Sequence, residues 1–325
     1  MPRSASPEPV TAVTDLAGAW LPARLSEVER RLAEIVAEPG EPIAADAGAT
    51  LAAGGKRMRP LLVLLCAGAG AGREAIRAAT AIELVHMATL VHDDVLDRAP
   101  LRRGRPTVVA TSGRDRALST GDLLFSRAFA ELTEPGSERQ VRSLAAASVA
   151  LARGELAQRQ DAFDVSITAE RYLDRCRLKT AALFECACVI GRDRPDSERR
   201  ALQAFGREIG VAFQLLDDVL DIVGPPERTG KARGTDLLDG TVNLPLIRAR
   251  ETAPELGELD LRSLDQEAAE TVCEKIAATG ATEAVRAEAR ERVRGAKSSL
   301  RDAGLGEADG TLFELVADGV VERYS

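Results

Sequence analysis

The five-residue string DDVLD occurs twice in this chain, at Asp93–Asp97 and again at Asp217–Asp221. On a helix, residues four apart lie on one face, about 6 Å apart along the axis, so the first and last aspartates of each copy form a pair. The stretches ATLV and VAFQLL, which precede the two copies closely, are apolar, and this argues against a solvated acidic face. Three carboxylates held near a core repel each other unless cations neutralise them.

Mg²⁺ is the cation that best suits such a cluster, because it takes oxygen ligands, keeps several waters and is commonly shared with substrate phosphates. An EF-hand is excluded, because the spacing of Asp, Asn and Gly that its loop requires is missing. Two facing clusters would hold a diphosphate between them through bridging metal ions. The predicted metal ligands are Asp93, Asp94, Asp97, Asp217, Asp218 and Asp221.

Two basic segments supply the positive charge that a diphosphate also needs. GGKRMRP (Gly54–Pro60) places Lys56, Arg57 and Arg59 after two glycines, and RRG (Arg102–Gly104) follows the first aspartate cluster. Arginine suits phosphate because its planar fork can bind two oxygens. Either segment alone would more often be a solvated loop. GGKRMRP is not a Walker A loop, because Arg rather than Ser or Thr follows the lysine and the earlier glycine is missing.

Two further features have competing explanations. His86 lies seven residues, or two helical turns, before Asp93 and therefore on the same face. A lone histidine is more often a core residue, but on this face it could donate a hydrogen bond to a phosphate. GAGAG (Gly68–Gly72) suggests a dinucleotide-binding loop, yet it follows no strand and no βαβ pattern surrounds it, so this alternative is rejected.

The elements that must position these groups are predicted to be helices. Ala, Leu, Arg and Glu dominate the composition, and alternating β-branched stretches are nearly absent. Gly and Pro clusters at Glu38–Pro42, Arg98–Pro106 and Gly224–Gly234 separate the helical stretches. The charged, amphipathic Leu259–Ser325 is expected to form covering helices. Apolar residues recur at helical spacing in Ile82–Val95, Ala117–Glu131, Leu144–Gln158, Tyr172–Ile190 and Ala201–Ile222.

The pattern predicts one all-α domain over residues 16–325, after a polar, proline-rich tail at residues 1–15 that is expected to be disordered. The 325 residues are 45% apolar, enough to bury a sizeable core, and the net charge of -8 argues against a nucleic-acid-binding protein. The five cysteines match no zinc pattern and are expected to be buried in a reducing cytosol. No signal peptide is visible, and LLVLLCAGAGAG (Leu61–Gly72) is too short to span a bilayer, so we expect a cytoplasmic protein without a transmembrane segment.

In their order along the chain, from about Gly54 to about Ile247, these motifs resemble those of trans-isoprenyl diphosphate synthases. GGKRMRP resembles that family's opening phosphate motif, and DDVLD with RRG resembles its first aspartate-rich motif. RLKTAALF contains the Lys-Thr element at Lys179–Thr180, and Phe213–Gln214 with the second DDVLD resembles the second aspartate-rich motif. GKARGTDLLDG (Gly230–Gly240) resembles the closing basic loop.

The resemblance implies a bundle of long antiparallel helices around a central cavity, usually as a homodimer. It implies three Mg²⁺ ions bridging an allylic diphosphate, isopentenyl diphosphate as second substrate, and a peripheral membrane contact for product release. The implied catalytic residues are Asp93, Asp94, Asp97, Lys179 and Asp217. The implied ligands of the allylic diphosphate are Arg102, Lys179, Thr180, Gln214 and Lys231. The implied pocket for isopentenyl diphosphate contains Lys56, Arg59, His86 and Arg103.

The chain departs from the family at one position. The family often has Gly-Lys-x-Thr-Leu-Pro after the closing loop, whereas this chain has GTVNLP (Gly240–Pro245), with Thr241 in place of the lysine. The change puts one contact to the allylic diphosphate in doubt. Because Lys231 is retained, activity is still expected.

Small residues before the first cluster bear on product length. Thr89 lies one turn before Asp93 on the same helix face, and Ala88 precedes it. In the family, a bulky aromatic residue at the position of Ala88 blocks the cavity and stops elongation early. The resemblance therefore implies a product longer than farnesyl, a medium-to-long polyprenyl diphosphate, with geranylgeranyl diphosphate as the alternative.

Two other functions compete with this one. A class I terpene cyclase shares the fold and the first motif, but it normally carries an Asn/Ser/Glu triad in place of a second DDVLD. A non-catalytic subunit of a two-component synthase has typically lost an aspartate cluster, and both clusters are intact here. The two intact copies therefore favour the synthase.

Overall fold

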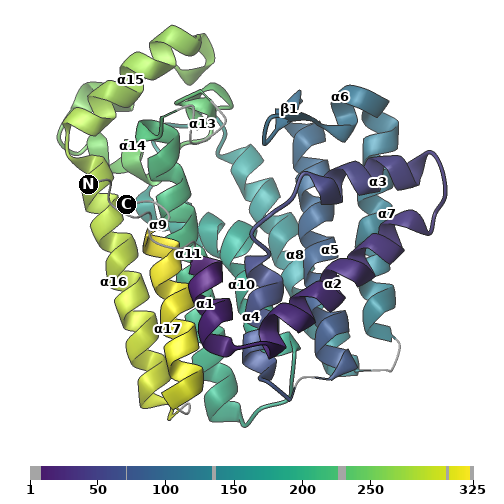
Figure 1. Cartoon of the computed structure of the whole chain (residues 1–325). Helices are drawn as coiled ribbons and strands as arrows, with labels where there is room; N and C mark the ends of the chain where they lie inside the picture. Colours follow the sequence, from purple (N-terminus) through teal and green to yellow (C-terminus); the bar gives the residue numbers. More distant parts are fainter. Residues whose placement is uncertain (1–8, 71, 134–136, 226–231, 305–306, 323–325) are drawn as a thin grey trace, which may run out of the picture. The chain divides into compact units, whose positions relative to one another are not determined.

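The computed structural model describes residues 9–70, 72–133, 137–225, 232–304 and 307–322. These residues are mainly helical with almost no strand, which confirms the predicted all-α class (Figure 1). The strands within these ranges are β1 (Leu101–Arg102) and β2 (Arg105–Pro106), which form one antiparallel hairpin. In the same ranges, no helix is both long enough and apolar enough to cross a membrane.

The chain divides into two compact units. The first contains the chain up to Ser148 with Cys186–Gln203 and Gly304–Val316, and the second contains Val149–Glu185, Ala204–Ala303 and the chain from Ala317. The organisation into one domain over residues 16–325 stays a prediction.

Among the described residues, the helices of the first unit alone are α1 (Pro9–Ala17), α2 (Trp20–Ala37), α3 (Ile43–Ala52), α4 (Met58–Ala67), α5 (Arg73–Leu96), α6 (Val108–Ser112) and α7 (Arg114–Thr133). Other helices in the described ranges contribute residues to both units: α8 (Glu138–Gln160), α10 (Ala182–Ile190), α11 (Asp196–Val223) and α17 (Glu307–Glu322). The described helical elements of the second unit alone are α9 (Ala169–Cys176), the π-helical turn η1 (Arg177–Ala181), α13 (Thr235–Leu238), α14 (Leu244–Ala249), the 3-10 turns η2 (Pro254–Glu258) and η3 (Leu261–Ser263), α15 (Gln266–Ala278) and α16 (Ala281–Asp302).

The structure confirms the helices predicted from apolar periodicity and extends them. Four of the five predicted segments lie inside α5, α7, α8 and α11, and the apolar run from Leu61 forms most of the buried α4. The fifth segment, Tyr172–Ile190, is interrupted by η1. Helix α1 begins at Pro9, inside the segment predicted as a tail, because proline suits the first turn of a helix and Val13 is fully buried.

Helix α5 is the centre of the first unit and carries the first DDVLD copy. It packs against α4 and α7, and α2 lies obliquely across it (Figure 1). Most of its residues are buried around the whole circumference, as expected for a helix inside a core.

All five cysteines of the chain are free and buried, which confirms that they pack as small apolar side chains.

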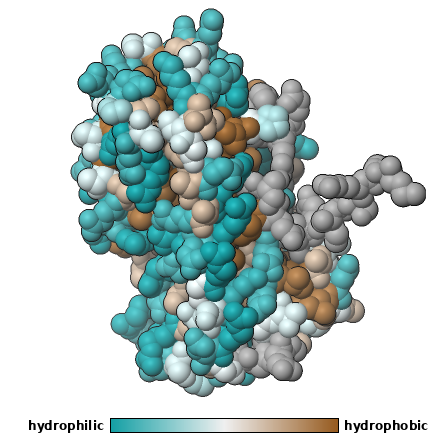
Figure 2. Space-filling view, turned by 90° about the vertical axis from the view of Figure 1, so that its left-hand side faces the viewer, coloured by the Kyte–Doolittle hydropathy of each residue, from teal (hydrophilic) through white to brown (hydrophobic). Residues whose placement is uncertain are grey.

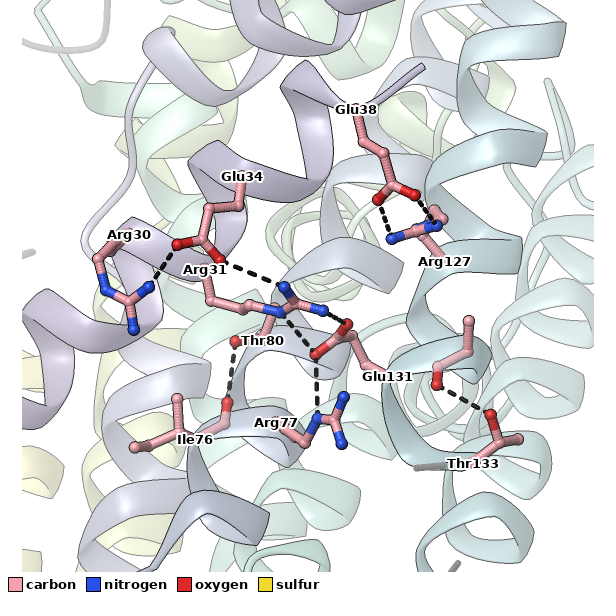
Figure 3. Close-up of polar contacts among 11 residues, drawn as sticks. Arg30, Arg31, Glu34, Glu38, Ile76, Arg77, Thr80, Arg127, Glu131 and Thr133 are labelled. Atoms are coloured by element: carbon pink, nitrogen blue, oxygen red, sulfur yellow. Dashed lines mark hydrogen bonds and ion pairs between the residues drawn. The ribbon is translucent and has the colours of Figure 1, made fainter. Parts of the chain in front are cut away.

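A buried charge cluster fixes α2 against α5 and α7 (Figure 3). Glu131 at the end of α7 is 3% exposed and accepts hydrogen bonds from Arg31 of α2 at 3.1 and 2.5 Å. Arg77 of α5 lies 3.6 Å from the same carboxylate, and Glu38 pairs with Arg127 as a second link between α2 and α7. Paired in this way, the buried carboxylate holds three helices in one arrangement.

The covering helices of the second unit are amphipathic, as predicted. Helix α16 buries Val285, Ala289, Val293, Ala296 and Leu300, which recur every three or four residues on one face. Viewed from the left of Figure 1, the outer face of this region is mainly hydrophilic (Figure 2). These helices therefore shield the core of the unit from water.

Candidate active site

Both DDVLD copies lie at the C-terminal ends of long helices. Asp93 is in the last turn of α5 and Asp97 caps its end, while Asp217 and Asp221 lie in the last two turns of α11. The negative end of the helix dipole is at the C-terminus, so carboxylates are unfavourable there. This placement adds to the repulsion among the carboxylates of each copy, so nearby cations are needed to stabilise their charged forms.

The two copies divide their aspartates in the same way. Asp93 and Asp97 are half-buried and Asp94 is buried; Asp217 is exposed and Asp218 is buried. Each residue of a helix is rotated by about 100° from the one before it, which turns the second aspartate away from the face that the first and last share. Each copy therefore directs one pair outward and one carboxylate into the protein.

Two adjacent arginines of the β1–β2 hairpin contact different parts of the first unit. The Nε of Arg102 donates to Asp94 Oδ1 at 2.8 Å, whereas a guanidinium nitrogen of Arg103 donates to the carbonyl of Gly54. Arg103 and Gly104 have φ angles of 52° and 71°, so both central residues of the two-residue turn are left-handed, as in type I′ hairpins. Arg102 thus belongs to the aspartate cluster and Arg103 to the GGKRMRP loop.

Cations converge around His86 on α5. Burial lowers the pKa of His86 well below its usual value, and the charges of Arg59 and Arg103 lower it further. Burial also lowers the pKa of Arg59 to about 10, with Glu83 opposing this shift and Arg103 adding to it. A neutral His86 retains one ring N–H to donate. Mutual repulsion among these cations favours an anion here, and Lys56 is half-buried in the same loop.

Arg57 anchors the loop that carries these cations. It adopts the left-handed conformation with φ 47°, and its guanidinium donates to Glu29 at 2.5 Å and to Glu83 at 2.8 Å. Burial raises the pKa of Glu83, against the attraction of Arg57. The two glutamates lie 28 and 26 residues from Arg57 in the sequence, so no local pattern could have identified them.

The second unit joins three predicted motifs in one chain of hydrogen bonds. Thr180 Oγ1 donates to Gln214 Oε1 at 2.7 Å, and Gln214 Nε2 donates to Asp218 Oδ1 at 2.8 Å. The hydroxyl of Tyr172, a residue that belongs to none of the predicted motifs, donates to Asp218 Oδ2 at 2.5 Å. The Lys-Thr element, Phe-Gln and the second DDVLD therefore form one local structure.

The pKa shifts of Tyr172 and Asp218, which belong to this series of hydrogen bonds, follow mainly from their burial. Burial and the nearby carboxylate of Asp218 raise the pKa of Tyr172 well above its usual value, so the phenol keeps its proton and remains a donor. Burial raises the pKa of Asp218, and repulsion from Asp236 adds to this, while the hydrogen bonds from Tyr172 and Gln214 oppose it.

Lys179 is held by a glutamate from another helix. Its Nζ lies 2.5 Å from Glu155 Oε2 of α8. The pKa of Glu155 is lowered: burial alone would raise it, but the attraction of Lys179 and the hydrogen bond from it outweigh this. The lysine side chain is therefore directed by a partner that the motif itself does not contain.

Two glycines make room for the π-helical turn η1, which carries Lys179 and Thr180. A Cβ on Gly154 of α8 would lie 2.6 Å from the backbone nitrogen of Lys179, and a Cβ on Gly210 of α11 would lie 2.6 Å from Ala181 Cα. Only glycine permits such close backbone approach. Single π turns inside helices occur frequently at functional sites.

We expect Gly154→Ala and Gly210→Ala to destabilise the protein by about 1–3 kcal/mol each, because the added methyl group meets rigid backbone. Gly295→Ala in α16 is the matched control, since a Cβ there meets nothing within 4 Å. Alanine at this exposed position should stabilise α16 by up to about 1 kcal/mol. Thermal unfolding of the three variants measures the difference, and equal midpoints would contradict the packing described here.

The closing loop is described only in part. Lys231 lies outside the described residues. Thr241, at the position where the family often has lysine, is half-buried, and its backbone nitrogen donates to the Asp236 carbonyl at 2.7 Å. The backbone nitrogen of Asp236 in turn donates to Asp221 Oδ2 at 3.2 Å, which ties this loop to the second DDVLD.

The residues predicted to set product length lie one turn before the first cluster. Ala88 is 0% exposed, and the Thr89 hydroxyl donates to the His86 carbonyl of its own helix at 2.8 Å. A residue at position 88 therefore has no solvent into which a larger side chain could turn. The role of both residues in product length stays a prediction.

The donors fit a hard cation. Among the described residues, no three His, Cys, Asp or Glu side chains are arranged to hold a metal ion. In phosphate-handling enzymes, Mg²⁺ is usually bound by one or two carboxylates together with phosphate oxygens. The outward pair of each DDVLD copy matches that mode in the type of its atoms.

Known proteins share this sequence and fold. The sequence profile described as polyprenyl synthetase matches residues 41–279. The chain is 42% identical over 230 residues to heptaprenyl diphosphate synthase component 2 of Geobacillus stearothermophilus, covering 69% of this chain and 72% of that protein. It is 36% identical to octaprenyl diphosphate synthase of Escherichia coli, covering 76% and 80%. A polyprenyl synthase from Caulobacter crescentus, solved with calcium and isoprenyl diphosphate, superposes over the full length of both chains with a TM-score of 0.91 and 32% identity.

Proposed function

The chain belongs to the polyprenyl synthetase family and is a trans-prenyl diphosphate synthase, and from that premise we propose that its product is a medium-to-long polyprenyl diphosphate. The substrates in this family are an allylic diphosphate and isopentenyl diphosphate. The small side chain of Ala88 supports the proposed length, because in the family a bulky aromatic residue at this position closes the product cavity. Relatives named heptaprenyl and octaprenyl synthases support it as well.

We assign three Mg²⁺ ions to the aspartate clusters, chiefly to the outward carboxylates Asp93, Asp97, Asp217 and Asp221. When bound, Mg²⁺ supplies positive charge that stabilises the departing diphosphate. Asp94, also predicted as a ligand, accepts a hydrogen bond from Arg102 and so sets that arginine beside the first cluster.

The remaining groups bind and orient the substrates. Arg102, Lys179, Thr180, Gln214 and Lys231 are assigned to the allylic diphosphate. Lys56, Arg59, His86 and Arg103 are assigned to isopentenyl diphosphate. With both diphosphates fixed, the allylic C–O bond breaks, the double bond of isopentenyl diphosphate attacks the carbocation, and a proton is lost to the released diphosphate. Donors held in advance by Glu155, Asp94 and Gly54 need little reorganisation during the reaction.

One assay tests the proposed function. The purified chain is incubated with labelled isopentenyl diphosphate, a series of allylic primers and Mg²⁺, and the products are separated by length. Elongation beyond farnesyl is the expected result. Hydrocarbon products would indicate a cyclase, and elongation that stops at farnesyl would refute the proposed length.

A second candidate is favoured by one finding. The relative with 42% identity is named as component 2 of a heptaprenyl diphosphate synthase, which suggests a chain that works with a partner subunit. The same assay decides this, because a subunit of that kind would give no product alone. The homodimer, the cytoplasmic location and a peripheral membrane contact stay predictions.

The hairpin arginines should affect different substrates. Arg103→Ala is expected to raise KM for isopentenyl diphosphate, and Arg102→Ala to raise KM for the allylic primer, each by about 10- to 100-fold, because a charged hydrogen bond is lost. Arg105→Ala is the control, since Arg105 is exposed on β2 of the same hairpin and should change neither KM. Equal effects of both variants on both substrates would contradict the division.

A further inference from the structure

The second DDVLD copy contains a carboxylate that is placed unlike a metal ligand. Asp218 is 3% exposed, and each of its two oxygens accepts a hydrogen bond from a protein donor, Tyr172 on one side and Gln214 on the other. Each oxygen keeps a second lone pair, but a hydrated ion would have to enter the buried environment of Asp218, where these two hydrogen bonds already pair the carboxylate.

The hydrogen bonds in this group run in one direction. The Tyr172 hydroxyl and the NH₂ group of Gln214 both donate to Asp218, so the carboxylate faces the NH₂ group. This turns the amide oxygen of Gln214 toward Thr180, whose hydroxyl then donates to it. Without Asp218, the remaining partner of the amide in this series is the Thr180 hydroxyl, which can either donate or accept and so would not distinguish the two orientations of the amide.

The elements that carry these groups are fixed by packing. Tyr172 on α9 is 1% exposed, and the guanidinium of Arg175 lies 5.3 Å from its ring centre. Thr180 is on η1, which Gly154 and Gly210 hold at close backbone distance. The hydrogen bonds from Tyr172 through Asp218 therefore make the positions of Gln214 and Thr180, which are assigned to the allylic diphosphate, depend on the position of α9.

We propose that Tyr172 and Asp218 are positioning residues that orient the Gln214 amide and the Thr180 hydroxyl, and that Asp218 acts in this way instead of binding metal. The inference rests on the proposed function of this site. In the fixed orientation, the second N–H of the Gln214 amide is the donor available to a diphosphate oxygen. The Thr180 hydroxyl, whose proton is donated to Gln214, instead offers its lone pairs to the allylic carbocation beside the departing diphosphate.

Metal binding is tested without turnover. Mn²⁺ with inorganic pyrophosphate is the probe, and bound Mn²⁺ is counted by electron paramagnetic resonance in the wild type, Asp218→Asn, Tyr172→Phe and Asp217→Asn. Asp218→Asn and Tyr172→Phe should match the wild type within about twofold in affinity, whereas Asp217→Asn should weaken binding by about tenfold or more. Loss of Mn²⁺ binding in Asp218→Asn equal to that in Asp217→Asn would overturn the inference.

Kinetics test the positioning role. Tyr172→Phe and Asp218→Asn should each lower kcat by about tenfold or more, with KM for isopentenyl diphosphate unchanged. The double variant should be no slower than the slower single variant, because both act through the same amide. A wild-type kcat in Tyr172→Phe, or multiplicative losses in the double variant, would overturn the inference.

A matched control separates positioning from stability. Thr80→Val removes a buried hydrogen bond of 2.9 Å to the Ile76 carbonyl in α5, away from this chain of residues. It should lower the thermal midpoint at most and leave kcat unchanged. If the wild type elongates no primer, the proposed function fails, and the Mn²⁺ counts still decide whether Asp218 is a ligand.

Discussion

Asp93→Ala and Asp217→Ala should each lower turnover by about a thousand-fold or more, because the lost carboxylate contributes several kcal/mol of stabilisation to the departing diphosphate through its metal ion. The thermal midpoint should be unchanged or raised, since each substitution relieves repulsion among carboxylates at a helix C-terminus. Steady-state assays over a range of Mg²⁺ concentrations and thermal unfolding measure the two effects.

Asp302→Ala provides the control for these variants. Asp302 is an exposed aspartate at the C-terminal end of α16, so its removal relieves the same unfavourable interaction with a helix dipole. We expect a similar change in thermal midpoint and no change in turnover. Near-normal turnover of Asp93→Ala or Asp217→Ala at saturating Mg²⁺ would rule out their assignment as metal ligands.

Ala88→Phe should shorten the product by at least one isoprene unit. Ala88 is fully buried, so a phenyl ring must occupy interior space, and a packed interior yields little. The product chains of wild type and variant are released from phosphate and compared by mass spectrometry. Overpacking should also cost about 1–3 kcal/mol of stability, which thermal unfolding detects.

Ala79→Phe separates the effect on length from the effect on packing. Ala79 is also fully buried on α5, and nine residues place it on the opposite side of the helix from Ala88. This variant should lose stability while its product length stays that of the wild type. The proposed floor of the cavity is elsewhere if both variants shorten the product equally, or if Ala88→Phe leaves the length unchanged.

The sequence was sufficient for the long helices and for the motifs that the structure joins in the second unit. Apolar periodicity located α5, α7, α8 and α11, because each of these helices buries a broad face over many turns. The motif resemblance identified Thr180 and Gln214 independently, and their side chains are hydrogen-bonded to each other.

Other features depend on contacts that a local pattern does not contain. The hairpin at Leu101–Pro106 has strands of two residues, too short for alternation, and its turn uses Arg103 where Asn is usual. Tyr172 meets Asp218 across 46 residues of sequence, and Arg57 meets Glu83 across 26. These pairs form only when separate helices have packed together.

The π-helical turn η1 has a consequence for the phase of the helix around it. A π turn holds one residue more than an α turn, so the side chains before and after Arg177–Ala181 are out of register by about 100°. A helical wheel drawn continuously through Tyr172–Ile190 therefore assigns one end of the segment to the wrong face. Deleting a single residue inside η1 would restore a regular helix and rotate Tyr172 away from Asp218. Although the segment is irregular, we therefore do not expect it to tolerate deletions as a surface loop would.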